Sequence, residues 1–280
     1  MNQDKVKHNL SMALIYILLT IGAIVMLFPF YWMISGSIKT LQEIQSTKIV
    51  WWPKHPQWIN FKTVLTMESN PFGIYFKNST IVSVMNTVCT LFTTILAAFA
   101  FSKFEFKGRD KFFSLLLGTM MVPSQMYLIT NFITITKMHL IDTLWAQIIP
   151  YTASIFYIYL LRQFFNQIPN QLYLAAKVDG CSDWKYLWTV MVPNAKSSLV
   201  TIGLFNFIAS WNAYLWPMLV SNSVKKRVLS TGLKYFAGDA GSDYHLMMAG
   251  ATIVVVPLII IYLIFQKYII QGIARGGLKG

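Results

Sequence analysis

Residues 10–34 read LSMALIYILLTIGAIVMLFPFYWMI and contain no Asp, Glu, Lys or Arg. About 20 apolar residues in an α-helix suffice to cross a hydrocarbon core about 30 Å thick. The run is too long for a signal peptide, whose apolar region of about 7 to 15 residues precedes a small-residue cleavage site. Here it ends in Pro29-Phe30-Tyr31-Trp32 instead. We therefore expect it to stay attached as a membrane anchor.

Five further stretches downstream have the same character. They are residues 78–102, 112–136, 143–161, 197–224 and 244–266, and none contains Asp, Glu, Lys or Arg. Membrane β-barrels need segments of about ten residues that alternate apolar and polar side chains, and these solid runs do not alternate. The sequence therefore predicts an all-α membrane protein with six transmembrane spans.

The overall composition agrees with a membrane protein. Charged residues make up only 12% of the chain, against about 25% in soluble domains, which argues against a soluble enzyme. The net charge of +13 could suggest nucleic-acid binding, but that function needs basic residues clustered on one face. Here they are spread through the segments between apolar runs, a pattern that favours contact with anionic lipid.

The short loops indicate the orientation. Lys103, Lys107, Arg109 and Lys111 crowd the segment after the second span, whereas Lys137 stands alone after the third. By the positive-inside rule, both termini then lie in the cytoplasm. The long loop of residues 35–77 would lie outside, where its tryptophans either form an interfacial belt or bind an extracellular partner.

Several kinds of chemistry are disfavoured. The predicted spans contain no Asp, Glu, Lys or Arg, which counts against an intramembrane hydrolase or a proton-driven transporter, although a sodium site built from carbonyl oxygens remains compatible. The two cysteines and four histidines lack metal-ligand spacing, so we expect no metal site and no disulfide. The nearest match to a P-loop, residues 272–277, has Leu278 before Lys279, so the chain should not bind ATP itself.

Uncharged polar residues within the spans are candidates for a substrate path. Amides can hydrogen-bond hydroxylated solutes, and aromatic rings can stack on the apolar faces of such solutes. Hydrogen bonding between helices is the alternative explanation. The candidates are Gln125, Asn131, Asn206, Trp211, Asn212 and Tyr214, and Asn86, Thr130, Gln147 and Trp216 have similar character.

The loop of residues 162–196, between the fourth and fifth spans, should fold. Pro169 and Asn170 predict the start of a helix over residues 171–179, Gly180 suits a left-handed C-terminal position, and Ser182 can cap a second helix. In that helix Trp184, Leu187, Trp188 and Met191 form one apolar stripe, and Pro193 should end it. The stripe fits either a helix lying on lipid or a partner-docking element.

Residues 174–180, LAAKVDG, with Pro193 thirteen positions after the glycine, resemble the EAA loop of permease subunits of binding-protein-dependent ABC importers. Leu174 stands where that family usually has Glu. The resemblance implies that the loop sits in a cleft of a cytoplasmic ATPase subunit and transmits its closure to the spans. The docking residues implied are Ala175, Ala176, Asp179, Gly180, Trp184, Leu187, Trp188, Met191 and Pro193.

Other stretches extend the resemblance over most of the chain. They are residues 29–40, 97–101, 106–109, 123–125, 161–165, 211–212, 215–217 and 276–280. Together they look like the six-span, maltose-type permease of the carbohydrate uptake group. The resemblance implies import of a sugar, an oligosaccharide or a polyol such as glycerol 3-phosphate across the cytoplasmic membrane of a prokaryote. It also implies a second, non-identical permease, two ATPase subunits that hold ATP and magnesium, and an extracytoplasmic solute-binding protein.

We expect three regions: residues 1–70 as anchor helix and first outer loop, residues 71–271 as the transport core, and residues 272–280 as a cytoplasmic tail. This chain itself should bind no cofactor and catalyse no reaction. Two other functions are possible. One is a self-contained six-span channel or facilitator that acts as a homo-oligomer, and the other is an export permease, which would not need the importer-type loop.

Overall fold

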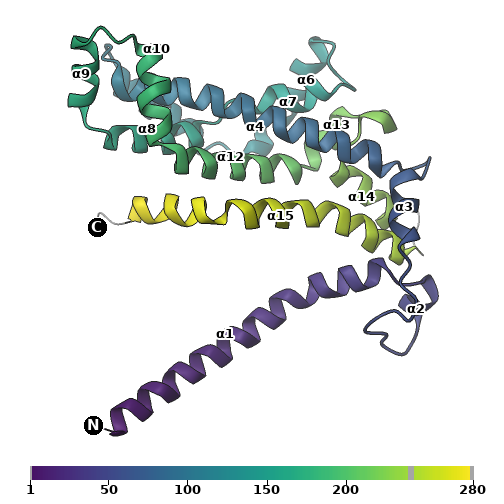
Figure 1. Cartoon of the computed structure of the whole chain (residues 1–280). Coiled ribbons are helices and arrows are strands. Elements are labelled where there is room, and N and C mark those ends of the chain that lie inside the picture. Colours follow the sequence, from purple (N-terminus) through teal and green to yellow (C-terminus); the bar gives the residue numbers. More distant parts are fainter. Residues whose placement is uncertain (1, 239–242, 278–280) are drawn as a thin grey trace. The chain divides into compact units, whose positions relative to one another are not determined.

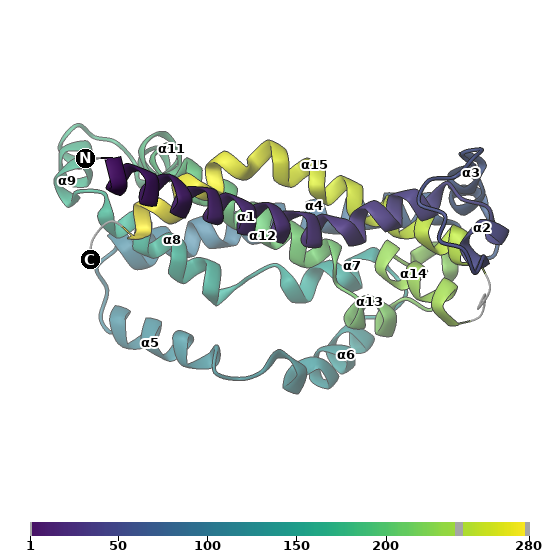
Figure 2. The same ribbon diagram turned by 90° about the horizontal axis from the view of Figure 1, so that it is seen from below.

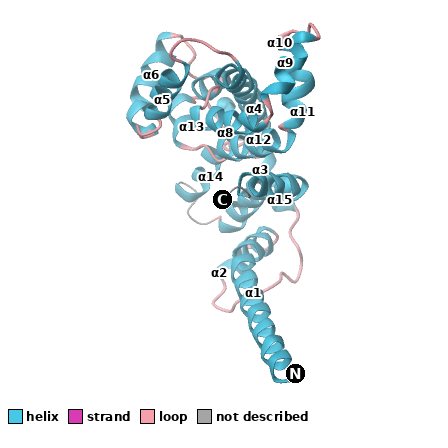
Figure 3. Cartoon of the chain, turned by 90° about the vertical axis from the view of Figure 1, so that its left-hand side faces the viewer, coloured by secondary structure: helices cyan, strands magenta, loops and turns pink. Residues whose placement is uncertain are grey.

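The structure, a computed structural model, describes residues 2–238 and 243–277. Within those residues every regular element is helical, as Figures 1 and 3 show, which confirms the all-α prediction. The elements are α1 (Asn2–Ser37), α2 (Leu41–Gln45), α3 (Ile59–Thr66), α4 (Phe72–Lys103), α5 (Arg109–Thr119), η1 (Ser124–Tyr127), α6 (Leu128–Lys137), α7 (Leu144–Ile148), η2 (Ile149–Tyr151), α8 (Ile155–Gln167), α9 (Asn170–Val178), α10 (Asp183–Tyr186), η3 (Leu187–Met191), α11 (Val192–Asn194), α12 (Lys196–Trp211), α13 (Leu215–Val220), η4 (Val224–Lys226), α14 (Leu229–Gly238) and α15 (Tyr244–Gly277).

The chain divides into two compact units. The first comprises Met1–Phe72 and Leu233–Val255, and the second comprises Gly73–Gly232 and Val256–Gly280. The predicted division into anchor, core and tail concerns the role of each region rather than its compactness. The two compact units therefore do not test it, and it stays a prediction. Its last segment, like the sequence match at 276–280, lies partly outside the described residues.

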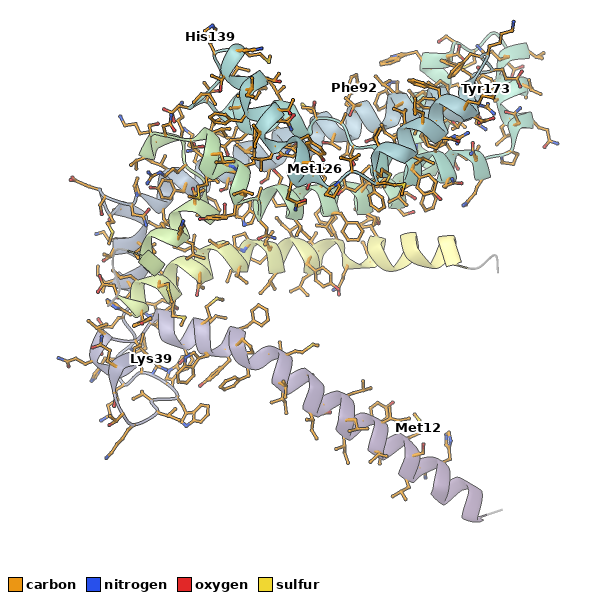
Figure 4. The ribbon with its side chains drawn as sticks, turned by 180° about the vertical axis from the view of Figure 1, so that it is seen from behind. Met12, Lys39, Phe92, Met126, His139 and Tyr173 are labelled. Atoms are coloured by element: carbon orange, nitrogen blue, oxygen red, sulfur yellow. The ribbon has the colours of Figure 1, made fainter. Side chains whose placement is uncertain are left out.

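In the first unit, α1 is a long helix with an apolar surface. All its side chains from residue 8 to residue 31 are exposed, and Figure 4 shows those around Met12 projecting on every side. The segment after α1 folds back onto the end of the helix: Tyr31 Oη and Ser35 Oγ both donate to the carbonyl oxygen of Trp51, at 2.9 and 2.7 Å. Asn60 Nδ2 donates to the carbonyl oxygen of Lys39 at 2.9 Å. The segment that follows α1 is therefore ordered by side-chain hydrogen bonds to the main chain.

In the second unit, α4 and α12 run side by side in both Figure 1 and Figure 2. Gly203 allows their close approach, because a Cβ atom there would lie 3.3 Å from Leu91 Cδ1. A buried apolar cluster lies at one end of the unit, where α4, α8 and α12 meet the loop that contains α9 and α10. Its fully buried members include Ala98, Leu161 and Phe165. This core fixes the loop to the long helices.

Three of the six predicted spans are single helices that are long and apolar enough to cross a membrane. They are His8–Ser37, Phe72–Lys103 and Tyr244–Tyr268. The other three are interrupted. α5 and the η1–α6 segment meet at 88°, the α7–η2 segment and α8 meet at 48°, and α12 ends at Trp211 before α13 begins at Leu215. Figure 2 shows the break between α5 and α6.

A proline lies at or near each break, although Pro29 and Pro257 lie inside the continuous helices α1 and α15. Pro123 lies at the break before η1, Pro150 lies in η2 and Pro217 lies in the short helix α13. A proline has no N–H to donate and disfavours helical geometry in the preceding residue. The predicted apolar stretches therefore exist, but three of them are pairs of shorter helices rather than single ones.

The loop between α8 and α12 has the predicted helix–turn–helix form. α9 begins at Asn170, Gly180 has a φ of +71°, and the Ser182 side chain accepts from the Lys185 backbone N–H as an N-cap. The expectation that Pro193 ends the second helix is wrong, since α11 continues to Asn194. The π-helical turn η3 precedes it, and this wider turn accommodates a residue without an N–H.

Candidate functional site

The turn at Gly180 is a Schellman motif, which shapes the tip of the loop. The Cys181 N–H donates to the Ala176 carbonyl at 2.8 Å, and the Gly180 N–H donates to the Lys177 carbonyl at 3.1 Å. This pair of bonds needs a left-handed residue at position 180, and glycine adopts that conformation without strain. No atom lies within 4 Å of the position that a Gly180 Cβ would take, so the turn faces open space.

A three-residue clamp holds the two helices of the loop together. Asp183 Oδ1 accepts a hydrogen bond from Tyr173 Oη at 2.6 Å and pairs with Lys177 Nζ at 2.8 Å. The hydrogen bond from Lys177, followed by that from Tyr173, holds the pKa of the Asp183 carboxyl below its ordinary value. The bond with Asp183 in turn raises the pKa of Lys177. The clamp therefore remains charged at neutral pH.

The predicted docking residues fall into three groups by burial. Ala175, Asp179, Gly180, Trp184 and Pro193 are exposed, Ala176 and Trp188 are half-buried, and Leu187 and Met191 are buried. Leu187 and Met191 pack into the core with Phe165, so they have no surface to offer a partner. The apolar stripe therefore faces the chain's own helices on one side, and its Trp184 end remains open.

Two basic side chains join the loop to α4 and α5. From the sequence, Lys103 indicated only the orientation, and this role was not predicted for Lys103 or Arg162. Lys103 Nζ, at the end of α4, donates to the carbonyl oxygen of Ile168 at 3.0 Å. Arg162 Nε donates to the carbonyl oxygen of Phe101 at 3.0 Å, and its Nη2 pairs with Asp110 Oδ1 at 2.8 Å. A usable signal was present, because both are the first basic residues after an apolar run. These bonds tie the entrance of the loop to the ends of α4 and α5.

A cavity of about 360 Å³, lined by both apolar and uncharged polar side chains, lies elsewhere in the second unit. It forms where the interrupted helices break: Gln125 comes from η1, Tyr151 from η2 and Tyr214 from the α12–α13 gap. Asn86 of α4 and Asn206 of α12 also line it. In membrane proteins, irregular backbone is tolerated where it lines a cavity, and broken helices often build solute sites. Figure 4 shows Tyr173 of the loop and His139, just after α6, at opposite ends of this unit.

Four of the six predicted path residues line the cavity, namely Gln125, Asn131, Asn206 and Tyr214. The other two do not. Trp211 is buried, with its ring centroid 5.6 Å from that of Phe207, and Asn212 is exposed. The lining residues that were not selected from the sequence include Tyr151, Ser210 and Ser124. Asn86, Gln147 and Trp216, which were noted from the sequence only for their similar character, also line the cavity. The prolines at the helix breaks could have indicated several of them.

The cavity walls combine amides with aromatic rings. The Tyr151 and Trp216 rings meet edge to face with centroids 6.1 Å apart, and Trp216 Nε1 donates to the Ala146 carbonyl at 2.9 Å. Two amide oxygens, Gln147 Oε1 and Asn206 Oδ1, are buried without a hydrogen-bond partner. Such walls suit a solute with both hydroxyl groups and apolar faces. Among the described residues, no cluster of His, Cys, Asp or Glu could hold a metal ion.

Comparison with known proteins identifies the class. Residues 1–275 match the family of binding-protein-dependent transport system inner membrane components, and the chain belongs to that family. It is thus a permease subunit of an ABC importer in the cytoplasmic membrane, and permease subunits of this family are not enzymes and have no ATPase site of their own.

Particular relatives are similar over almost their whole length. The arabinooligosaccharides transport system permease protein AraQ of Bacillus subtilis is 30% identical, covering 98% of this chain and 96% of its own. The trehalose/maltose transport system permease protein MalG of Thermococcus litoralis is 34% identical, with coverage of 94% and 97%. A chain in the crystal structure of a bacterial ABC transporter involved in the import of the acidic polysaccharide alginate superposes with a TM-score of 0.80 at 28% identity, with coverage of 96% and 98%.

Proposed function

We propose that this permease moves a carbohydrate, either a sugar, an oligosaccharide or a related polyol, and that the cavity at the helix breaks is part of its path. The observation that carries the proposal is the lining of amides, hydroxyls and aromatic rings at the point where three helix pairs are interrupted. The names of the similar permeases support the solute class.

In the complete importer the chain crosses the membrane six times, with α1, α4 and α15 as single helices and three interrupted pairs. Both termini lie in the cytoplasm. The hydrogen bond from Lys103 to Ile168 supports this orientation, because it joins the basic segment after α4 to the entrance of the loop. Residues 71–271 form the transport core between the anchor and the tail.

The loop from α9 to α11 docks on a cytoplasmic ATPase subunit. Ala175, Asp179, Gly180 and Trp184 supply exposed surface, Ala176, Trp188 and Pro193 border it, and Leu187 and Met191 anchor the loop from beneath. Two such ATPases hold ATP and magnesium and drive the cycle. A second, non-identical permease completes the path, and an extracytoplasmic protein delivers the solute, in keeping with the family's description.

Affinity purification of the tagged chain from its own membranes in mild detergent, followed by mass spectrometry, tests this assembly. Recovery of a P-loop ATPase and a second permease is expected. A homo-oligomer without any ATPase would contradict the proposal and favour a self-contained facilitator. Uptake of labelled saccharides by the recovered complex in ATP-loaded liposomes then tests the solute class.

A further inference from the structure

A basic segment lies at the end of the second unit that is opposite to the loop. Residues 225–227 are Lys-Lys-Arg, and they follow Ser223, whose N–H donates to Asp142 Oδ1 at 2.9 Å. Figure 4 shows His139, three positions before Asp142, at the end of the unit remote from Tyr173 of the loop. In the proposed orientation, this end lies outside the cytoplasmic membrane.

Two buried amide side chains hold the basic segment in a fixed position. Asn78 Nδ2 donates to the carbonyl oxygens of Lys225 and Arg227, at 2.9 and 2.8 Å. Gln147 Nε2 donates to the carbonyl oxygen of Lys226 at 3.0 Å. The main chain of all three basic residues is therefore bound to α4 and α7. Lys225 remains exposed, whereas Lys226 and Arg227 are half-buried.

Two further basic side chains are exposed at the same end of the unit. Lys77 lies near the start of α4, directly before the asparagine that holds the segment, and Lys137 is the last residue of α6. We call these two residues and residues 225–227 the basic patch. Asp142 is the one acidic residue in the chain segments that carry the patch, which are residues 73–78, 137–143 and 221–228.

The positive charge of the patch is largely unbalanced. Asp142 interacts electrostatically with Lys226. Among the described residues, no carboxylate forms an ion pair with Lys77, Lys225 or Arg227. The loop end differs, because Asp110 and Asp183 pair with basic side chains there. The patch can therefore offer its charge to a partner.

Neither membrane orientation nor lipid binding accounts for the patch. By the positive-inside rule, short outer loops are poor in Lys and Arg, so three consecutive basic residues there oppose the orientation signal. The attraction of basic segments to anionic lipid acts at the cytoplasmic leaflet. A surface that is already ordered favours binding of a specific protein, because less ordering is needed on association. The segment also borders the cavity, since Gln147 and Val228 both line it.

We propose that the basic patch docks the extracytoplasmic solute-binding protein through an acidic face of that protein, beside the cavity that receives the solute. Complementary charges across an interface steer the encounter of two proteins and raise the association rate more than they slow dissociation. The inference rests on the proposed function, because it requires that such a protein delivers the solute to this chain.

Photo-crosslinking in intact cells first tests which molecule contacts the patch. A photoreactive phenylalanine analogue replaces Lys225 or, as the control, Lys107, which is exposed in the segment after α4. We expect a solute-binding protein to be crosslinked from position 225 and not from position 107. Crosslinks from position 225 to lipid alone would overturn the inference.

Association kinetics then test the chemistry of docking. The crosslinked solute-binding protein is purified and passed over the complete importer, which is immobilised in nanodiscs of zwitterionic lipid. At low salt, Lys77→Glu and Lys225→Glu should each lower the association rate constant at least about fivefold, with a much smaller change in dissociation. The loss should shrink as the ionic strength rises, because salt screens exposed charges.

Lys107→Glu makes the same charge reversal at the loop end and is the matched control, which should leave both rate constants unchanged. Thermal stability and recovery of the ATPases establish that each variant is assembled. An association rate that changes neither with salt nor in the two patch variants would overturn the inference.

The failure of each proposal is distinct. If the solute-binding protein associates with both patch variants and drives saccharide uptake as it does for the unaltered importer, the docking inference is wrong and the proposed function stands. If the unaltered importer takes up no saccharide with this binding protein, the proposed function itself is wrong.

Discussion

The two ends of the second unit use different chemistry. At the loop end, charged side chains hold the loop in place: Lys103 and Arg162 donate hydrogen bonds to carbonyl oxygens, and Asp183 joins the two helices of the loop. In the lining of the cavity, the polar side chains carry amides and hydroxyls, and two amide oxygens of lining residues have no hydrogen-bond partner. Charge is expensive in hydrocarbon and inexpensive beside water, so the difference follows from the membrane. The loop, which is held to the helices by several bonds, is suited to transmit force. The cavity, whose lining contains amide oxygens without partners, is suited to a passing solute.

The largest effect should come from Gly180→Trp. The turn faces open space, so the indole meets no atom of the chain, but tryptophan is strained in the left-handed conformation of position 180. The strained turn and the bulky ring together disturb the surface that we propose to contact the ATPase. We expect ATP-driven uptake to fall at least about tenfold, which corresponds to about 1.4 kcal/mol at the coupling interface. Gly180→Asn is the matched control, because asparagine tolerates the left-handed conformation. Uptake is normalised to the amount of protein inserted in the membrane. Normal uptake by the tryptophan variant would show that the loop does not take part in coupling.

Lys103→Met should have the next largest effect. It leaves the carbonyl oxygen of Ile168 without its donor, and because this hydrogen bond is only partly buried, the loss should lie at the lower end of the range of about 1–3 kcal/mol. The loop entrance would then move independently of α4, so ATP would be hydrolysed with less solute transported. The ratio of solute moved to ATP hydrolysed should fall severalfold, and Lys103→Arg should largely restore it. An unchanged ratio would mean that this hydrogen bond stabilises the fold but plays no part in coupling.

Trp188→Phe tests whether the half-buried tryptophan contributes to docking. Its Nε1 is buried without a hydrogen-bond partner, so removing the N–H takes no bond away from the fold. Because this Nε1 has almost no accessible surface, the ATPase cannot accept a hydrogen bond from it, and recovery of the ATPase should be unchanged. The thermal stability of the free subunit should not decrease. A fall in recovery would contradict this expectation and make the N–H part of the docking surface.

Asp183→Asn should have a small effect. Both members of the Lys177 pair are about two-fifths exposed, and exposed pairs stabilise proteins by about 0–1 kcal/mol. Because the folded pKa of Asp183 is depressed, its contribution is present above the ordinary carboxyl value of 3.8 and is lost only as the pH falls through the lower folded pKa. Transport near neutral pH should therefore not depend on this group's titration. A double-mutant cycle with Lys177→Met measures the coupling.

Structural features that depend only on neighbouring residues could be predicted from the sequence. The Gly180 turn and the Ser182 cap depend on neighbouring residues, and both were predicted. The course of the helix past Pro193 was not, because a π turn arises from packing of Leu187 and Met191 in the core. Trp211 was expected in the solute path for its aromatic ring, but it is buried against Phe207.

The sequence by itself determined that the chain is an all-helical membrane protein, because composition, charge-free runs and local turn chemistry act within a few tens of residues. The importer-type loop was indicated by the resemblance of residues 174–180 to the EAA loop. Only the tertiary structure decided which polar residues share a cavity and which apolar residues turn inward. Gln147 and Asn206 are 59 positions apart in the sequence and belong to different helices. Nothing in either segment alone tells whether its amide oxygen will find a donor, since that depends on which helices the breaks bring together.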